Sequence, residues 1–503
     1  MLRTKLILFG LLWATASHAQ DVQEFKLLPS DGQPGDVFGF AVALSGKTVI
    51  VGANGKDFDK GATYFFEKSD IGWQEVVKFI PADIAPTAYY GFSVAIDGNV
   101  AVVGARNDDD KGAFAGAIYL YERTASGWLQ TAKIIPDDVR ALDYFGHAVG
   151  ISGETIIASA NGDDVNRGVV YVFGRDESSG EWQWQATLVA DNRSQDDVFG
   201  ASVAIDGDDI LVGATSSDVG GFQSGSAYFF RRENGVWQQS QKIAPHDGAS
   251  EDLFGASVDL SGDYAIIGAI GNDEKKPGAG AAYIYQHDAQ SGWQFQAKLT
   301  ASNGETQDQF GNAVALDGSD VVVGALMQFS SGKGAAYHFR RTNDQWIEQR
   351  IFTASDANAD DRFGNAVALE NGVAVIGARY KDDMGYNSGA AYIFSGFTKT
   401  VGIGEQAGDA IRTFALHQNY PNPFNPATAI VYELAAPAKV NIAVFDLTGR
   451  LVNVLVDNVL PAGQFRARWD GTDRSGSMLA SGIFLLKMQA GEFIQTRKMT
   501  LLH

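Results

Sequence analysis

Short apolar runs, separated by Gly, Asp and Asn, follow one another along residues 22–394. One run recurs at intervals of 52 to 56 residues, as an aromatic-glycine pair followed by alternating small and β-branched residues. Its seven copies are DVFGFAVAL (36–44), AYYGFSVAI (88–96), DYFGHAVGI (143–151), DVFGASVAI (197–205), DLFGASVDL (252–260), DQFGNAVAL (308–316) and DRFGNAVAL (361–369). A period of this length, repeated seven times, predicts a closed repeat architecture.

Each repeat contains four apolar runs, which we call strands A to D. Strand A carries the aromatic-glycine pair, and strand B carries VGA or IGA, whose glycine follows 13 residues later in six copies. In the third copy, Ser159 replaces that glycine. Strand C begins near a Gly-Ala-x-Tyr phrase, and strand D begins near a tryptophan in six repeats. Four short antiparallel strands per repeat predict an all-β fold, a seven-bladed β-propeller of four-stranded blades.

The two ends of the repeat region are complementary. The seventh repeat stops at Phe394 without a strand D, whereas VQEFKLL (22–28) aligns with VVKFI (76–80) in the first strand D. We therefore expect residues 22–28 to complete blade seven, so that the propeller spans residues 20–396 and leaves no open sheet edge.

The repeats resemble the FG-GAP repeats of the integrin α-subunit propeller over roughly residues 21–396. The resemblance implies a binding or adhesion role. It does not carry over the integrin calcium sites, which lie in a D-x-D-x-D-G loop between strands A and B. Here that connection is a tight turn such as LSGK or IDGN, and its constant length leaves no room for the calcium loop.

The N-terminus predicts an export signal over residues 1–19. Arg3 and Lys5 precede an apolar run from Leu6 to Ala14, and the small-x-small pattern predicts cleavage between Ala19 and Gln20. No later segment is a transmembrane candidate. Residues 397–415 are polar and contain glycine, which predicts a linker.

Residues 416–503 form a different module with six strand-like runs. The segments NYPNPFNPAT (419–428), VFDLTGRLV (444–452) and WDGTDRSG (469–476) resemble the C-terminal sorting domain of type IX secretion substrates. That domain is similar to the Ig-like domain of flagellar hook-capping proteins. The resemblance implies a small Ig-like β-sandwich, the type IX machinery as partner, and a location outside a Gram-negative cell, secreted or on the outer surface. The alternative is an Ig-like module retained for binding.

The formal net charge is −21, which disfavours nucleic acid and anionic lipid as partners. The carboxylates concentrate in the D-to-A and B-to-C loops, which share one face of an antiparallel meander. Loop length varies there, and variable loops on a fixed scaffold are common binding sites. The extracellular ligand, protein or glycan, is not identified by any motif.

Several loop carboxylates are candidates for binding a ligand or a cation, and calcium is the cation considered. The alternative is that they are solvated loop residues without a binding role. They are Asp108, Asp109, Asp110, Asp163, Asp164, Asp382 and Asp383. The run Asp356-x-Asn358-x-Asp360 imitates the start of a calcium loop but lacks its glycine and its final acid. The Asp three residues before the FG glycine, present in six copies, is expected to accept a turn N–H. Asp259 is expected to be solvated.

Catalytic patterns are scarce: the chain has no G-x-S-x-G, no H-E-x-x-H, no phosphate loop and no cysteine. His338 takes a strand C position and is expected to pack rather than to act as a base. The sequence therefore favours a non-catalytic binding or adhesion protein without a cofactor. Two alternatives remain: a hydrolase or lyase that uses carboxylates of the acidic face, and a structural component of the cell envelope.

Overall fold

The computed structural model describes residues 22–396, except 71, 177 and 328–331, and much of residues 414–502. The gaps in the second range are 417–418, 420–421, 423, 425–427, 435–437, 461–462, 470, 475–477 and 492. The predicted signal peptide, its cleavage site and the linker up to residue 413 lie outside the described residues. The chain divides into two compact units, Met1–Phe397 and Thr398–His503.

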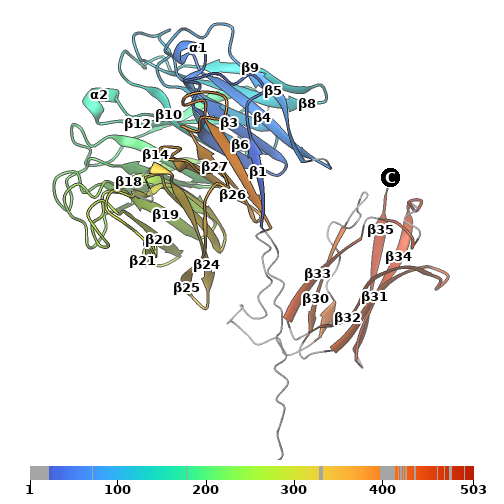
Figure 1. The fold of residues 1–503 in the computed structure, drawn as a ribbon. Helices are drawn as coiled ribbons and strands as arrows, with labels where there is room; N and C mark the ends of the chain where they lie inside the picture. Colours follow the sequence, from blue (N-terminus) through green and yellow to red (C-terminus); the bar gives the residue numbers. More distant parts are fainter. Residues whose placement is uncertain are drawn as a thin grey trace, which may run out of the picture. The chain divides into compact units, whose positions relative to one another are not determined.

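The first unit consists of seven four-stranded antiparallel sheets, so the predicted seven-bladed β-propeller is confirmed (Figure 1). The seven A strands are β2 (Phe38–Ser45), β6 (Tyr90–Asp97), β10 (Phe145–Ser152), β14 (Phe199–Asp206), β18 (Phe254–Ser261), β22 (Phe310–Asp317) and β26 (Phe363–Glu370). The B strands are β3 (Thr48–Ala53), β7 (Val100–Ala105), β11 (Thr155–Ala160), β15 (Asp209–Ala214), β19 (Tyr264–Ala269), β23 (Asp320–Ala325) and β27 (Val373–Ala378).

The outer half of each blade is made by strands C and D. The C strands are β4 (Ala62–Ser69), β8 (Ala117–Thr124), β12 (Val169–Arg175), β16 (Ser226–Glu233), β20 (Ala281–Asp288), β24 (Ala335–Thr342) and β28 (Ala390–Ser395). The D strands are β5 (Gly72–Phe79), β9 (Gly127–Ile134), β13 (Trp182–Leu188), β17 (Val236–Ile243), β21 (Gly292–Leu299), β25 (Gln345–Phe352) and β1 (Gln23–Leu27). A strands of successive blades lie next to one another and form the inner wall of the ring.

Burial along the strands follows from this arrangement. Strand B is the second strand of its blade, and the sheets of the two neighbouring blades cover its faces. A strand such as β3 is therefore buried along its whole length and is rich in Val and Ile. The FG aromatic packs edge to face against the strand C tyrosine, as in Phe38 and Tyr64, whose ring centroids are 5.3 Å apart. The hydrophobic core is therefore a series of clusters between adjacent sheets.

Two glycine positions, both kept in six of the seven repeats, mark where adjacent blades touch through their backbones. A Cβ on Gly52 would lie 2.1 Å from the carbonyl oxygen of Gly91 in the next blade, and Gly91 itself has a φ of +83°. Only glycine fits both positions without displacing a strand. In blade three, Ser159 takes the place of the first glycine, and its Oγ accepts the N–H of Ala148 at 3.0 Å.

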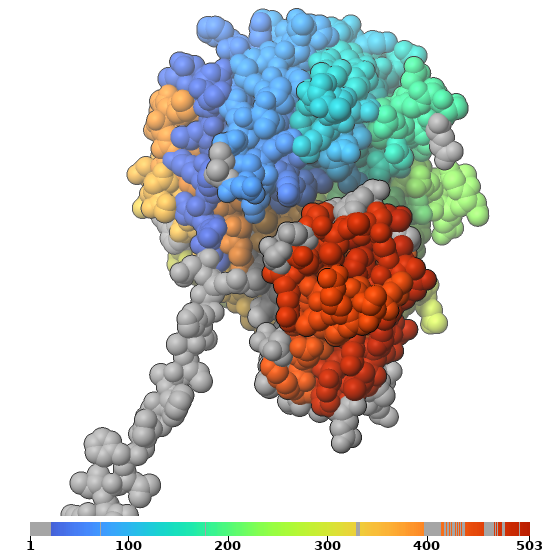
Figure 2. All heavy atoms as spheres, turned by 90° about the vertical axis from the view of Figure 1, so that its right-hand side faces the viewer, coloured from blue at the N-terminus to red at the C-terminus, as the bar shows by residue number. Residues whose placement is uncertain are grey.

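The ring is closed by the two ends of the repeat region. Strand β1 pairs antiparallel with β28, with Phe25 opposite Ile393 and Lys26 opposite Tyr392. A parallel bridge joins Phe38 in blade one to Gly389 in blade seven, like the bridges between other neighbouring blades. In the space-filling view, blue atoms from the start of the propeller adjoin orange atoms from its end (Figure 2).

Two short helical segments, α1 (Lys56–Asp59) and α2 (Asp163–Asn166), lie in the B-to-C loops of blades one and three (Figure 1). Among the described residues, no helix has the length and apolar character needed to cross a lipid bilayer.

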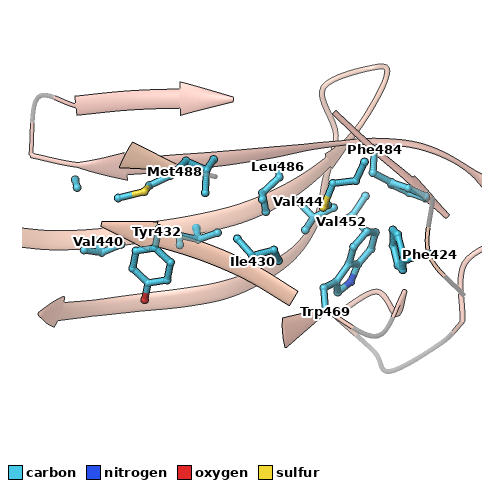
Figure 3. Packing of buried hydrophobic residues seen from close by; sticks show 14 of the residues in the cluster. Phe424, Ile430, Tyr432, Val440, Val444, Val452, Trp469, Phe484, Leu486 and Met488 are labelled. Carbon is cyan, nitrogen blue, oxygen red and sulfur yellow. The ribbon is translucent and has the colours of Figure 1, made fainter. Parts of the chain in front are cut away.

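The second unit has two antiparallel sheets, which fit the predicted Ig-like β-sandwich. One contains β29 (Ala415–Leu416), β30 (Thr428–Leu434) and β33 (Gly463–Trp469). The other contains β32 (Leu451–Leu460), β31 (Ala438–Asp446), β34 (Gly482–Ala490) and β35 (Phe493–Leu501). In its core, the ring centroid of Trp469 lies 5.5 Å from Phe424 and 5.1 Å from Phe484 (Figure 3).

Candidate binding face

The D-to-A and B-to-C loops of the propeller form one face, which we call the loop face. In six blades the D-to-A loop is held by the aspartate three residues before the FG glycine, as predicted. Asp36, for example, accepts the N–H of Gln33 at 2.8 Å. The same bond recurs in five other blades, at Asp143, Asp197, Asp252, Asp308 and Asp361. These carboxylates are buried, so their role is structural.

A second recurring arrangement joins three loop-face residues, and we call it the Tyr–Asp–Lys cluster. In blade one, Lys78 on strand D lies opposite Tyr64 on strand C. Asp31 of the D-to-A loop accepts a hydrogen bond from each, both at 2.7 Å. Burial disfavours the charged carboxylate, but the bonds from Lys78 and Tyr64 outweigh it and lower the pKa of Asp31 to about 2.

The lysine–aspartate pair recurs in blades two, five and seven. The Lys133 ammonium lies 3.2 Å from Asp83 and 2.9 Å from Asp108 in blade two. In the other two blades the pairs are Lys298–Asp247 and Lys26–Asp356, each at 2.6 Å. Sequence analysis missed these pairs, although each strand D lysine except Lys26 follows its tryptophan by five residues.

The predicted cation candidates of blade two are therefore occupied by an ammonium group. Asp108 is buried and binds both Lys133 and the Tyr119 hydroxyl, and Asp110 binds Lys133 at 2.7 Å. Asp109 is exposed. Burial disfavours the charged lysine, but the bonds that Lys133 donates to Asp110 and Asp108 outweigh it and raise the pKa of Lys133. Lys133 therefore offsets the negative charge of Asp108 and Asp110 in this blade.

The other four candidates lie in two further B-to-C loops and do not form a common site. Asp164 binds Arg167 at 2.8 Å, and Asp163 lies 3.7 Å from Arg193. Asp382 accepts the N–H of Asn387, and Asp383 pairs with Lys26. In the part of the chain that the structure describes, no three His, Asp or Glu side chains are grouped as metal ligands.

The calcium-like run in blade seven is likewise held by protein groups. Asp356 accepts hydrogen bonds from Lys26 and from the Tyr392 hydroxyl. Burial opposes ionisation, but these two bonds lower the pKa of Asp356. Its loop neighbour Asp361 binds Asn358 and the buried Lys381. The ammonium groups of Lys26 and Lys381 thus take the role that the cation has in a calcium loop.

Blade four breaks the pattern and contains a cavity. Asn192 stands at the position of the cluster aspartate, so Lys242 has no carboxylate within ion-pair distance among the described residues. Its ammonium lies 5.0 Å from the centroid of the Tyr228 ring. The cavity has a volume of about 460 Å³ and is lined by Asn192, Ser194, Gln195, Asp196, Asp197, Ser216, Ser217, Asp218, Val219, Phe222, Gln223 and Lys242.

Exposed apolar side chains stand on the B-to-C loops of several blades. Phe58 is 92% exposed, Tyr386 74% and Phe222 61%. Phe58 has a left-handed backbone with a φ of +61°, as has the exposed Val165 in blade three. The conformation is unfavourable for bulky side chains, so the loop structure holds these residues outward against a local preference.

Two single-residue expectations need correction or completion. Asp259 is half-buried rather than fully solvated: it accepts the N–H of Leu260 at 2.9 Å and of Leu316 in the next blade at 2.7 Å, and burial raises its pKa to about 7. His338 is buried, and its Nε2 lies 2.8 Å from Asp320, which also accepts Arg340 at 2.7 Å. It belongs to a polar network rather than to apolar packing alone.

Comparison with known families agrees with the fold. The model of the FG-GAP repeat matches seven segments, 22–66, 73–121, 128–173, 182–230, 237–285, 293–339 and 346–394. The protein is thus an FG-GAP β-propeller, a class suggestive of binding or adhesion. Because these segments cover more than half of the chain, it belongs to the FG-GAP repeat family. The model of the FlgD Ig-like domain matches residues 424–492.

No curated protein sequence matches the chain. Among solved structures, Sqt1 from Saccharomyces cerevisiae is similar, with 10% sequence identity and a TM-score of 0.42. The match covers 80% of this chain and 94% of that one.

Proposed function

We propose that this protein is a non-catalytic binding or adhesion module whose loop face holds an extracellular protein or glycan. The observation that carries the proposal is the set of exposed apolar side chains on the B-to-C loops, above all Phe58, Phe222 and Tyr386. Exposed large apolar groups that gather on one face are typical of interaction sites.

The backbone of these loops supports the same role. Bulky residues in the left-handed region are strained by roughly 1–3 kcal/mol each, and such strain persists where function requires it. Phe58 and Val165 both have a φ of +61°. The cavity of blade four adds concave surface beside Phe222, where amide and hydroxyl groups can bind a polar ligand.

The ion pairs of the loop face favour binding over the alternative of a hydrolase or lyase. A general acid or base needs a side chain that reaches the substrate and exchanges a proton with it. Asp31, Asp108 and Asp247 each bind both a lysine and a tyrosine hydroxyl instead. The third candidate, a structural envelope component, offers no role for the exposed aromatic residues.

The proposed route to the outside combines both ends of the chain. Residues 1–19 direct export, with cleavage after Ala19, and residues 416–503 act as the type IX sorting domain, leaving the propeller secreted or on the outer surface of a Gram-negative cell. The match of residues 424–492 to the FlgD Ig-like domain supports the sorting assignment. A chain without residues 416–503 is expected to fold but stay in the periplasm, and its normal appearance in the medium would contradict this route.

The binding role is tested with the mature full-length chain on arrays of extracellular proteins and glycans, with and without calcium. The test variant carries Phe58→Ser, Phe222→Ser and Tyr386→Ser. The matched control carries Leu129→Ser, Val236→Ser and Ile347→Ser, exposed apolar residues on the D strands. We expect at least a tenfold loss of captured ligand in the first variant only. Equal capture by both variants, or none by the wild type, would reject the proposal.

A further inference from the structure

Two arginines at corresponding positions of blades seven and two lie beside a chain of aromatic rings. Arg379 and Arg106 each follow the VGA or IGA alanine at the end of strand B, where other blades have Asn, Thr, Ile or Leu. The Arg106 guanidinium lies 4.7 Å from the centroid of Phe92 and 4.6 Å from Tyr144. That of Arg379 lies 5.6 Å from Phe40 and 5.0 Å from Tyr380.

The rings connect the two arginines across the inner wall of the propeller. Phe40 and Phe92 come from strands β2 and β6, and their centroids are 4.9 Å apart. Blade one thus supplies a ring that lies between the arginine sites of blades seven and two. We call this group the arginine–aromatic hub. All six side chains are half-buried, so the hub still meets solvent.

These two arginines differ from the other half-buried arginines of the described propeller, each of which lies within 4.0 Å of a carboxylate. Neither Arg106 nor Arg379 has such a partner, and the Nε of each is buried without a hydrogen bond among the described residues. In a chain with a net charge of −21, carboxylates are abundant, so this absence is informative.

The surroundings of the two arginines also favour the binding of an anion. Burial lowers the pKa of both arginines, which means that the fold disfavours their positive charge. His147, whose ring centroid lies 5.2 Å from Phe92, adds no charge, because burial and the nearby Arg106 lower its pKa to about 3. A carboxylate would offset the unfavourable charge and could bind a guanidinium in the bidentate manner that arginine favours.

We propose that the arginine–aromatic hub binds an acidic side chain of a partner polypeptide. The acidic loops around the hub repel a polyanion, so the partner segment presents an isolated Asp or Glu within a neutral or basic surround. This inference rests on the proposed binding role of the loop face and names the chemistry of one contact on it.

The test uses the mature full-length chain and two blocked, fluorescently labelled peptides, Lys-Lys-Gly-Glu-Gly-Lys-Lys and the same peptide with Gln in place of Glu. We expect the Glu peptide to bind the wild type about tenfold more tightly or better, as for a charge-assisted hydrogen bond. The double variant Arg106→Gln, Arg379→Gln is expected to abolish that preference, and Arg106→Lys to keep part of it.

The matched control is Arg341→Gln. Arg341 also lies over an aromatic ring, Tyr264 at 5.1 Å, but it pairs with Asp344 at the turn that joins strands C and D. We expect this variant to keep the wild-type preference. Equal binding of the two peptides to the wild type, or an unchanged preference in the double variant, would overturn the inference, as would binding of an oligogalacturonate without binding of the Glu peptide.

A second measurement covers the case in which the double variant does not fold. Phenylglyoxal modifies accessible arginines, and mass spectrometry locates the modified residues. The Glu peptide is expected to protect Arg106 and Arg379 in the wild-type chain, and equal modification with and without it would overturn the inference. If array capture survives in a folded double variant that has lost its peptide preference, the array ligand uses another part of the loop face and the proposed function stands alone.

Discussion

Blades two and four share a scaffold but differ in how they use one lysine. In blade two, Lys133 lies among Asp83, Asp108 and Asp110. In blade four, Lys242 occupies the corresponding position of strand D, yet Asn192 replaces the aspartate and a cavity lies beside it. The propeller sheets do not change between the two cases. Asn192, Ser217 and Val219 stand where blade two has Asp83, Asp108 and Asp110, so these loop residues together decide whether the lysine closes ion pairs or lines an open cavity.

The remaining blades show that the two positions vary separately. Blade three keeps the aspartate, Asp138, but has Thr187 in place of the lysine. Blade six has neither, since Asn303 and Ile351 stand at the two positions. The cluster is therefore not required for a blade to form, and each blade can be altered by itself.

The largest predicted effect concerns blade seven, the blade whose lysine comes from the opposite end of the repeat region. Deleting residues 22–28 removes Lys26, exposes the edge of β28 and loses the burial of Leu27. Loss of one buried leucine alone costs about 2–5 kcal/mol, so we expect a marked fall in the free energy of unfolding. Calorimetry of the full-length chain measures it, and an unchanged melting temperature would show that β1 does not close the ring.

A smaller effect separates blades two and four directly. Lys133→Met leaves Asp108, only 3% exposed, without its cation, and we expect a loss of about 3–5 kcal/mol. Lys242→Met removes a lysine that has no carboxylate partner in the described part of the chain and should change stability by less than about 0.5 kcal/mol. Urea unfolding of both variants tests the difference. Equal losses would mean that the ion pair is not what distinguishes the blades.

The smallest predicted effect is expected for a substitution that gives blade four the aspartate of the Tyr–Asp–Lys cluster. Asn192→Asp places a carboxylate near Lys242 and Tyr228, and we expect a gain of about 0.5–1 kcal/mol. The control is Asn303→Asp in blade six, where Ile351 offers no ammonium group and no gain is expected. Thermal unfolding at neutral pH compares them, and a similar gain in both would argue against pairing with Lys242.

The fold could be predicted because the same residue types recur at nearly the same spacing in each repeat. Glycine at the blade contacts and the aromatic residue beside it follow from close backbone approach, so their spacing is visible in the chain. The site depends on pairings between elements: Lys133 on strand D meets Asp83 only once the loop before strand A of the same blade is placed. The fixed interval from tryptophan to lysine in strand D was the sequence signal for these pairs. Nothing comparable marks Arg106 and Arg379, each of which lies over one ring of its own blade and one ring of the next blade.

The pairing of β1 with β28 also orders events in time. The strand at the start of the propeller sequence is synthesised first, yet its partner is made only with the last repeat. Joining them means closing a very long loop, which is slow and entropically unfavourable. A chain cut short within any repeat would lack the partner of β1 and keep an unpaired edge. Closure therefore acts as a check on length, since only a chain that extends through β28 can pair its own first strand.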